Sequence, residues 1–272
     1  MKEFQFSPVT KEDLTHAFQE LGVKKGMDLM VHSNLRGLKY IVNGAHDVIE
    51  ALLDVVVPNE GTILMPAHSG HLTDPTDWTC PRIPKDWIPV IQERLRPFDP
   101  KTTEIKNRGV LAKTFFTYPN VKRSIHPLNS VCALGRKAEY YTSEHPLHES
   151  EGKDSPAWRF YQEQGYALLI GVEIHNSLTF IHLGEYISDM GYLKHGTTKV
   201  LTVDKYGRNI FVPLRKYPIT GQAFKKLHHP LEERGLMKKI KINAAIIYFF
   251  PFREAIDLTL EMIKEDPMVW KE

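Results

Sequence analysis

The stretches Asp28-Leu29-Met30-Val31-His32 and Gly61-Thr62-Ile63-Leu64-Met65-Pro66 decide the fold class of this chain. Each is a short apolar run bounded by polar or turn residues, which is typical of a buried strand. Between them Val48, Leu52 and Val56 recur at helical spacing and predict one apolar helix face. A strand, a helix and a second strand in this order form a βαβ unit, whose two strands pair in parallel.

The segments on either side extend this unit into a larger α/β protein. Thr10-Lys11-Glu12-Asp13 resembles a capping box, and the helix that it begins stops at Gly22. Residues 165–172 form a strongly apolar strand, and the segments 197–203 and 209–214 flank a glycine-containing turn, as in a β-hairpin. We therefore predict one domain over residues 1–272, an α/β fold with three α/β/α layers, a mostly parallel or mixed central sheet and a small β-hairpin insertion.

The composition excludes several classes of protein. Of the 272 residues, 42% are hydrophobic and 25% charged, which is an ordinary globular profile. The net charge of +2 gives no bulk attraction for nucleic acids or membrane surfaces, so an anionic ligand must be bound locally. Two cysteines cannot build a disulfide scaffold, and the apolar stretches 166–172 and 244–250 are far shorter than the ~18 residues of a membrane span. We expect a cytoplasmic protein with neither nucleic-acid nor membrane partners.

His182 and Glu185 are the pair with the clearest chemical potential. A spacing of three places both side chains on one face of a helix. A carboxylate beside an imidazole fixes its tautomer and stabilises the imidazolium, as a general base requires. The alternative is a solvent-exposed helix pair worth a few tenths of a kcal/mol, which on spacing alone is the commoner outcome.

Two further histidine pairs, His68 with His71 and His145 with His148, have the HxxH spacing of some metal sites. No HExxH, CxxC or Asp-rich loop accompanies them, which favours structural or solvated histidines and no metal. A metal-dependent hydrolase built on the histidines remains an alternative. The absence of GxGxxG, GxxxxGK[ST] and GxSxG motifs disfavours the common dehydrogenases, kinases and α/β-hydrolases.

Several motifs follow one another in the order and spacing of a known family. They are Val31-His32-Ser33-Asn34-Leu35, Gly44-Ala45, Gly61-Thr62-Ile63-Leu64-Met65-Pro66, Ser124-Ile125-His126-Pro127-Leu128-Asn129-Ser130 and His182-Leu183-Gly184-Glu185-Tyr186, with Asp74-Pro75 and Glu151-Gly152-Lys153-Asp154-Ser155-Pro156 as further matches. Together they resemble the aminoglycoside 3-N-acetyltransferase family over roughly residues 10 to 260. No single motif is decisive, but their collinearity is highly specific.

The resemblance implies an antibiotic-resistance type of enzyme that transfers acetyl from acetyl-coenzyme A to a small-molecule amine, without a metal and in a fold distinct from the common GNAT acetyltransferases. It implies that His182 acts as the base and Glu185 as its orienter, with His126 close to the active site. It also implies coenzyme A contacts in the strand-end loop around His32. The predicted cofactor contacts are His32, Ser33, Asn34, Leu35, Ser69, Arg108, Val110, Ser124 and Ser130, with Lys122 and Arg123 as further candidates for the phosphates.

The acceptor is less defined by the sequence. Asp74, Asp77 and Glu173 are the candidate carboxylates for a cationic amine. Glycine at position 184 stands where alanine is common in the family, and the approach to His182 is bulkier than usual. An amine of ordinary pKa must lose a proton before it attacks a thioester, so direct transfer needs a base. Besides the hydrolase, a coenzyme A binding protein without aminoglycoside turnover is an alternative, and a homo-oligomer is possible.

Overall fold

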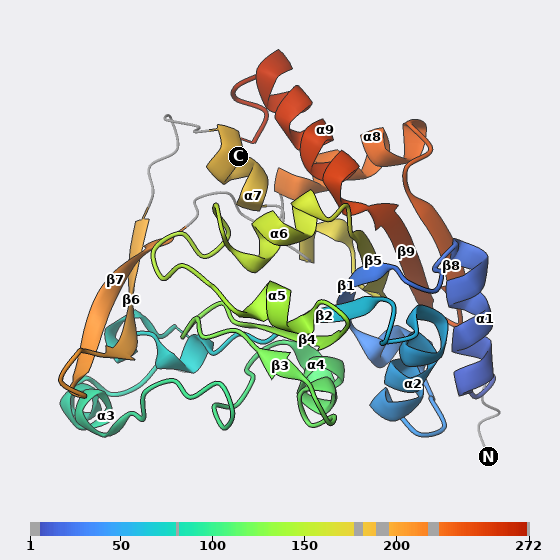
Figure 1. Ribbon diagram of the computed structural model, residues 1–272. Helices are drawn as coiled ribbons and strands as arrows, with labels where there is room; N and C mark the ends of the chain where they lie inside the picture. Colours follow the sequence, from blue (N-terminus) through green and yellow to red (C-terminus); the bar gives the residue numbers. More distant parts are fainter. Residues whose placement is uncertain (1–5, 80–81, 177–181, 189–195, 217–222, 271–272) are drawn as a thin grey trace.

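The computed structural model describes residues 6–79, 82–176, 182–188, 196–216 and 223–270. Its centre is a seven-stranded mixed sheet in the order β3-β4-β2-β1-β5-β9-β8 (Figure 1). The strands are β1 (Asp28–Ser33), β2 (Thr62–Pro66), β3 (Lys122–Arg123), β4 (Val131–Gly135), β5 (Tyr166–Ile170), β8 (Lys238–Ile242) and β9 (Ala245–Pro251). β1 lies parallel to both β2 and β5, whereas the remaining neighbours are antiparallel.

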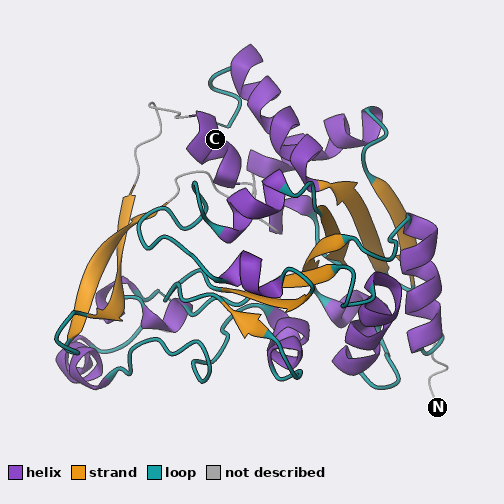
Figure 2. Cartoon of the chain, in the orientation of Figure 1, coloured by secondary structure: helices purple, strands orange, loops and turns teal. Residues whose placement is uncertain are grey.

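Helices cover both faces of this sheet, which gives the three predicted layers (Figure 2). One apolar core joins the sheet to α1 (Lys11–Leu21), α2 (Ala45–Val56) and α4 (Gly109–Phe116). On the other face two cores join it to α5 (Ala138–Thr142), α6 (Pro156–Gln162), α7 (His182–Ser188), α8 (His228–Glu233) and α9 (Phe252–Glu265). The predicted fold class is therefore confirmed, with a mixed sheet rather than a mostly parallel one.

The local signals of the sequence act where they were expected. Thr10 caps α1 in a capping box with Asp13, and Gly22 ends the helix at a φ of 99°. The predicted βαβ unit is β1-α2-β2, and His182 and Glu185 lie on one helix, α7, as their spacing predicts. Residues 177–181, which precede α7, lie outside the described part of the chain.

Two regions differ from the sequence prediction. The predicted loop after β1 contains the 3₁₀ helix η1 (Leu35–Leu38), which Asn34 caps through its side chain. The Pro- and Trp-rich segment 73–100, which lacks a periodic pattern, contains η3 (Pro75–Asp77), η4 (Lys85–Trp87) and α3 (Ile88–Arg94). Short elements of this kind depend on proline positions and turns, which apolar periodicity does not reveal.

The predicted hairpin is a separate two-stranded sheet, β6 (Gly196–Val203) and β7 (Asn209–Lys216), which stands apart from the body at the left of Figure 1. It contacts the body through a small apolar cluster that includes Leu72, Val200 and Leu214. A bridge between Thr73 and Val200 fastens it to the segment after β2. The hairpin thus lies over the long segment 73–100 rather than over the central sheet.

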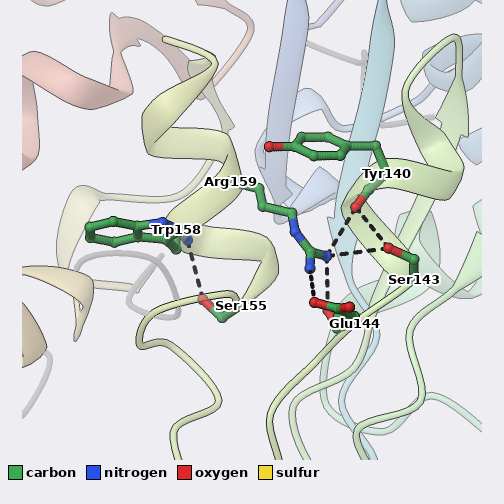
Figure 3. A network of polar contacts seen from close by, with 6 residues as sticks. All are labelled: Tyr140, Ser143, Glu144, Ser155, Trp158 and Arg159. Carbon is green, nitrogen blue, oxygen red and sulfur yellow. Dashed lines mark hydrogen bonds and ion pairs between the residues drawn. The ribbon is translucent and has the colours of Figure 1, made fainter.

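A buried arginine fixes the start of α6 against the end of α5 (Figure 3). The guanidinium of Arg159 donates to the carbonyls of Tyr140 and Glu144 and pairs with the Glu144 carboxylate at 2.8 Å. Ser155 caps α6 by accepting from the backbone N–H of Trp158, with proline at the first helical position. These contacts hold the chain on both sides of the turn that contains Glu151.

A cationic cavity at the ends of the parallel strands

The main cavity, of about 640 Å³, lies beyond the carboxyl ends of β1 and β2. Because parallel strands end at the same edge of a sheet, their C-terminal loops meet there, and this is where ligands of open α/β sheets bind. Six of the nine predicted cofactor contacts line it. The lining consists of Val31, His32, Ser33, Asn34, Leu35, Arg36, Met65, Pro66, Asn107, Arg108, Gly109, Val110, Ala112 and Val172.

Glycine at position 171 allows the ends of β1 and β5 to approach one another. Gly171 has a φ of +65°, and a Cβ there would lie 2.4 Å from the backbone oxygen of Asn34. The Asn34 side chain in turn accepts a hydrogen bond from the Arg36 backbone N–H at 3.2 Å. These contacts hold in place the start of the loop after β1, which forms one wall of the cavity.

The opposite wall is the N-terminus of α4. Asn107 and Gly109 both have positive φ, at 57° and 76°, so the backbone turns sharply on either side of Arg108. Arg108 occupies the N-cap position, and no side chain caps this helix. The first N–H groups of a helix have no partner within it, and together with the helix dipole they favour an anion.

The charges in the cavity have one sign. Among the described residues that line it, Arg36 and Arg108 carry guanidinium groups and there is no carboxylate. Arg108 donates through Nη2 to Nδ1 of His68, which follows β2, while its Nε is buried without a hydrogen-bond partner. Burial lowers the pKa of His68 well below its usual value, so its imidazole is neutral and can accept this bond. The arrangement suits a polyanionic ligand.

The carboxyl group of Glu151 is buried near Arg108. Glu151 is 3% exposed, and burial raises the pKa of its carboxyl well above the usual value, against the opposing effect of Arg108. Burial also lowers the pKa of His32 to about 3, and the charge of Arg108 acts in the same direction. The charge of Arg108 thus acts on two neutral histidines, His32 and His68, and on the buried carboxyl group of Glu151.

His126 is buried and both of its ring nitrogens are bonded. Nδ1 accepts from the backbone N–H groups of Leu128 at 3.1 Å and Asn129 at 2.8 Å, and Nε2 therefore carries the proton that it donates to the Leu147 carbonyl. Burial lowers the pKa of His126 to about 4. These bonds suit a residue that positions the loop, and the catalytic role predicted for it stays a prediction.

Three predicted cofactor contacts lie outside the cavity lining. Ser69, Ser124 and Ser130 are fully buried. Ser69 and Ser130 accept hydrogen bonds from the guanidinium of Arg123, and Ser124 bonds to Nδ1 of His145. The three hydroxyls are thus hydrogen-bonded to other side chains of the protein in this structure. Arg123, a candidate for the phosphates, has its donors taken up in the same way, and the candidate Lys122 is paired with Glu139.

The predicted base lies on the opposite face of the sheet from α4. His182 begins α7, and its ring meets that of Phe224 edge-on, with centroids 5.7 Å apart. The next residue, Leu183, is buried in the same core as Met30 of β1. The backbone of Glu185 lies in α7, three residues after His182, but its side chain lies outside the described part. The pairing of the two side chains therefore stays a prediction.

The three predicted acceptor contacts are not brought together. Asp74 lines a separate cavity of about 540 Å³ under the hairpin, with Gln92 and Asn209 among its neighbours. Asp77 is exposed on η3. Glu173 follows β5 and accepts a hydrogen bond from the Tyr248 hydroxyl at 3.3 Å.

Burial would raise the pKa of Asp74, but the hydrogen bonds from Thr76 and Gln92 outweigh it and lower the pKa. Asp74 is therefore ionised at neutral pH and can serve a cationic ligand.

The sequence prediction did not select Arg36, His68 or Glu151 for this site. Arg36 directly follows the predicted contacts Asn34 and Leu35, and Glu151 begins one of the motifs shared with the family. The positions of these two residues in the sequence could therefore have indicated that they lie near the site. Nothing in the sequence indicates that Glu151 is buried near Arg108. Among the described residues, no three or more His, Cys, Asp or Glu side chains are grouped as around a metal ion. Within the same ranges no helix is long and apolar enough to cross a membrane.

Comparison with known proteins gives this cavity a context. The family model described as aminoglycoside 3-N-acetyltransferase matches residues 30–264, which includes every predicted site residue. The chain belongs to this family. As an aminoglycoside 3-N-acetyltransferase family member it is an acyltransferase of the N(3)-acetyltransferase-like kind.

Two curated relatives cover nearly the whole chain. The SPbeta prophage-derived aminoglycoside N(3')-acetyltransferase-like protein YokD of Bacillus subtilis (strain 168) is 33% identical over 252 residues, 92% of this chain and 90% of that protein. The aminoglycoside N(3)-acetyltransferase III of Pseudomonas aeruginosa is 30% identical over 257 residues, 93% and 91% of the two chains.

Solved structures agree with the fold. The crystal structure of YokD has a TM-score of 0.88 at 32% identity and covers 96% of this chain and 95% of its own. A structure titled AAC-IIIb binary with CoASH has a TM-score of 0.80 at 26% identity, with coverage of 95% and 97%. A mutant of the aminoglycoside acetyltransferase AAC(3)-IVa in complex with a gentamicin has a TM-score of 0.83 at 25% identity, with coverage of 99% and 94%. This chain and the three solved structures therefore share one fold over nearly their full lengths.

Proposed function

We propose that the chain transfers the acetyl group of acetyl-coenzyme A directly to an amine of an aminoglycoside or a related amino sugar. The observation that carries this proposal is the cavity at the ends of β1 and β2, which has two guanidinium groups, an uncapped helix N-terminus and no carboxylate among its described lining residues. Coenzyme A has a pyrophosphate and a phosphate monoester, and such a polyanion matches this lining. The relative solved with CoASH supports the same cofactor.

The cavity suits the phosphate part of the cofactor in particular. Arg108 and the N–H groups at the start of α4 would hold the pyrophosphate, because a dipole and a fixed cation then act on the same charge. His68 keeps the Arg108 side chain in place from behind. Val110 is 56% exposed at this wall and offers an apolar surface to the uncharged remainder of the cofactor.

The chemical step requires a base for the amine. In the proposed step His182 accepts a proton from the amine as its nitrogen bonds to the thioester carbonyl carbon, and the carbon–sulfur bond then breaks. The proton on His182 passes to the departing thiolate, so that an acetamide and free coenzyme A result. Glu185, one helical turn on, would stabilise the imidazolium, and backbone N–H groups would hold the oxyanion. General-base help of this kind contributes about 10² to 10⁴ in rate.

Asp74 is our candidate for binding the cationic acceptor. It is ionised, as its lowered pKa requires, and lines a cavity with polar neighbours beneath the hairpin. The relative solved with a gentamicin supports an aminoglycoside as the kind of ligand to try first. The acceptor is open to direct assay.

The test is thiol release from acetyl-coenzyme A across a panel of aminoglycosides, amino sugars and simple amines. We expect release with at least one aminoglycoside or amino sugar. His182→Ala should lower kcat by about 10² to 10⁴ while the Kd of coenzyme A stays unchanged. His229→Ala is the matched control, because His229 is an exposed histidine on α8 whose ring pairs with its neighbour Glu233.

Each other outcome favours a different function. Normal turnover in His182→Ala would refute the assigned base. Tight binding of coenzyme A without thiol release on any amine would favour the binding protein without turnover. Stoichiometric Zn²⁺ by elemental analysis, with a hydrolytic activity that chelation abolishes, would favour the metal-dependent hydrolase.

A further inference from the structure

The two cations of the main cavity lie in different surroundings. Arg108 is held from inside by His68, and burial lowers its pKa, so it belongs to the interior wall. Arg36 is exposed on η1 at the rim. Within the described residues, no carboxylate pairs with the guanidinium of Arg36, whereas Lys106, which lies near the site, pairs with Glu104. Arg36 is therefore free to bind an incoming anion.

The backbone of Arg36 is fixed even though its side chain is free. Its N–H donates to the side chain of Asn34 at 3.2 Å, and its carbonyl accepts from the N–H of Lys39 at 3.2 Å. A cation whose backbone is held by hydrogen bonds and whose side chain is exposed can bind a ligand that enters from solvent at little cost in backbone order. The planar guanidinium donates two parallel hydrogen bonds to a phosphate, which an ammonium does not.

Coenzyme A has one internal and one terminal anionic group, just as the cavity has one interior arginine, Arg108, and one arginine at its rim, Arg36. The pyrophosphate lies within the molecule, between the pantetheine and the ribose, and each of its phosphates carries a single charge. The 3′-phosphate is a terminal monoester on the ribose, and a monoester of this kind carries about −1.5 to −2 at neutral pH. In the proposed function the thioester end of the cofactor must reach His182. If the interior wall at Arg108 holds the pyrophosphate, the other end, which carries the monoester, then lies toward the rim.

We propose that Arg36 is the contact for the 3′-phosphate and that it makes the chain prefer coenzyme A over dephospho-coenzyme A. The inference rests on the proposed function, because it requires that the cavity binds coenzyme A. It adds a specificity-determining residue that acts on cofactor selection and not on the acetyl transfer itself.

The test measures the binding of coenzyme A and of dephospho-coenzyme A by calorimetry, to the wild-type chain and to three variants. Wild type should bind coenzyme A about tenfold more tightly than the dephospho form. Arg36→Ala should weaken coenzyme A about tenfold and leave the dephospho form unchanged, so that the preference disappears. Arg36→Lys should retain part of it. Lys39→Ala is the matched control: Lys39 is the next cation along the chain, its ammonium lies over the ring of Phe6, and it does not line the cavity.

The outcomes separate the two proposals. If wild type binds coenzyme A but Arg36→Ala keeps the preference, or weakens both ligands equally, the role of Arg36 is refuted and the proposed cofactor stands. The same holds if Lys39→Ala removes the preference as effectively. If wild type binds neither ligand, the proposed function itself fails. Because Arg36 is exposed, its variants should unfold at the wild-type denaturant concentration, which is checked in the same samples.

Discussion

At the scale of single residues, Arg123 has the most extensive set of contacts near the site. Its guanidinium donates to the Ala67 carbonyl and to the hydroxyls of Ser69 and Ser130, and it also reaches the Thr103 carbonyl. It lies between two aromatic rings, 4.9 and 5.0 Å from their centroids. Charge alone made Arg123 a candidate for the phosphates, but its donors already bind the two residues on either side of His68.

Arg123→Met should therefore destabilise the fold. The methionine keeps the apolar stem but leaves several buried acceptors without a donor, and we expect the free energy of unfolding to fall by about 3 kcal/mol. Urea unfolding at pH 7 measures the loss. Lys122→Met is the matched control, since Lys122 is exposed and its ion pair with Glu139 should contribute less than about 1 kcal/mol. Equal losses in the two variants would contradict this account.

At the scale of elements, the packing of α7 against α9 sets where His182 lies. Gly184 of α7 faces Thr259 of α9, and a Cβ at position 184 would lie 2.9 Å from Cγ2 of that threonine. Thr259 is 1% exposed, and its hydroxyl is bonded to the Ala255 carbonyl at 2.8 Å, so it cannot turn away freely. The glycine therefore permits the close approach of the two helices that hold the candidate base.

A double-mutant cycle tests this contact. In Gly184→Ala the gain in helix propensity, about 1 kcal/mol, is opposed by overpacking of about 1–3 kcal/mol. Thr259→Ser keeps the hydroxyl and removes the methyl group that the new Cβ would meet. We expect the double variant to be at least about 1 kcal/mol more stable than the sum of the single changes predicts, as measured by urea unfolding. If the changes in unfolding free energy of the two single variants simply add in the double variant, the new Cβ does not meet the threonine methyl group, and the prediction is refuted.

At the scale of the whole molecule, buried histidines make stability depend on pH. Burial lowers the pKa of His32 to about 3 and of His126 to about 4, and lowers the pKa values of His68 and His145 well below the usual range. As pH falls through about 6.5 the unfolded chain protonates these groups while the folded chain keeps them neutral. The unfolded state then binds more protons, so stability present above pH 6.5 is lost as the pH falls toward 4.

We expect each of these histidines to remove about 2 kcal/mol of unfolding free energy between pH 7 and pH 5. Glu151 acts in the opposite direction, because burial raises its pKa, but one acid does not offset four histidines. Urea unfolding across this range checks the sign, and His126→Gln, which does not titrate, should shrink the loss by about one histidine's share. A protein equally stable at pH 7 and pH 5 would refute the prediction.

The sequence by itself determined what acts over a few residues. The capping box at Thr10, the stop at Gly22 and the β1-α2-β2 unit follow from caps and periodicity, whose interactions span three or four positions. The helical spacing of His182 and Glu185 likewise agrees with their place in α7. The collinear motifs also indicated the family, because they preserve order along the chain. Four of the predicted cofactor contacts, residues 32–35, could be placed at one strand end for the same reason, and they line the cavity.

The tertiary structure alone decided which of those residues share a cavity and which are committed elsewhere. Arg108 meets His68 across 40 residues of sequence, and Arg123 meets the Ala67 carbonyl across 56. The charge of a side chain does not reveal whether its donors face solvent, a ligand or a backbone carbonyl, because that depends on strand order and on burial by distant helices. For this reason Arg36 emerged as a free cation, and Ser69, Ser130 and Arg123 as parts of the frame, only once the chain was folded.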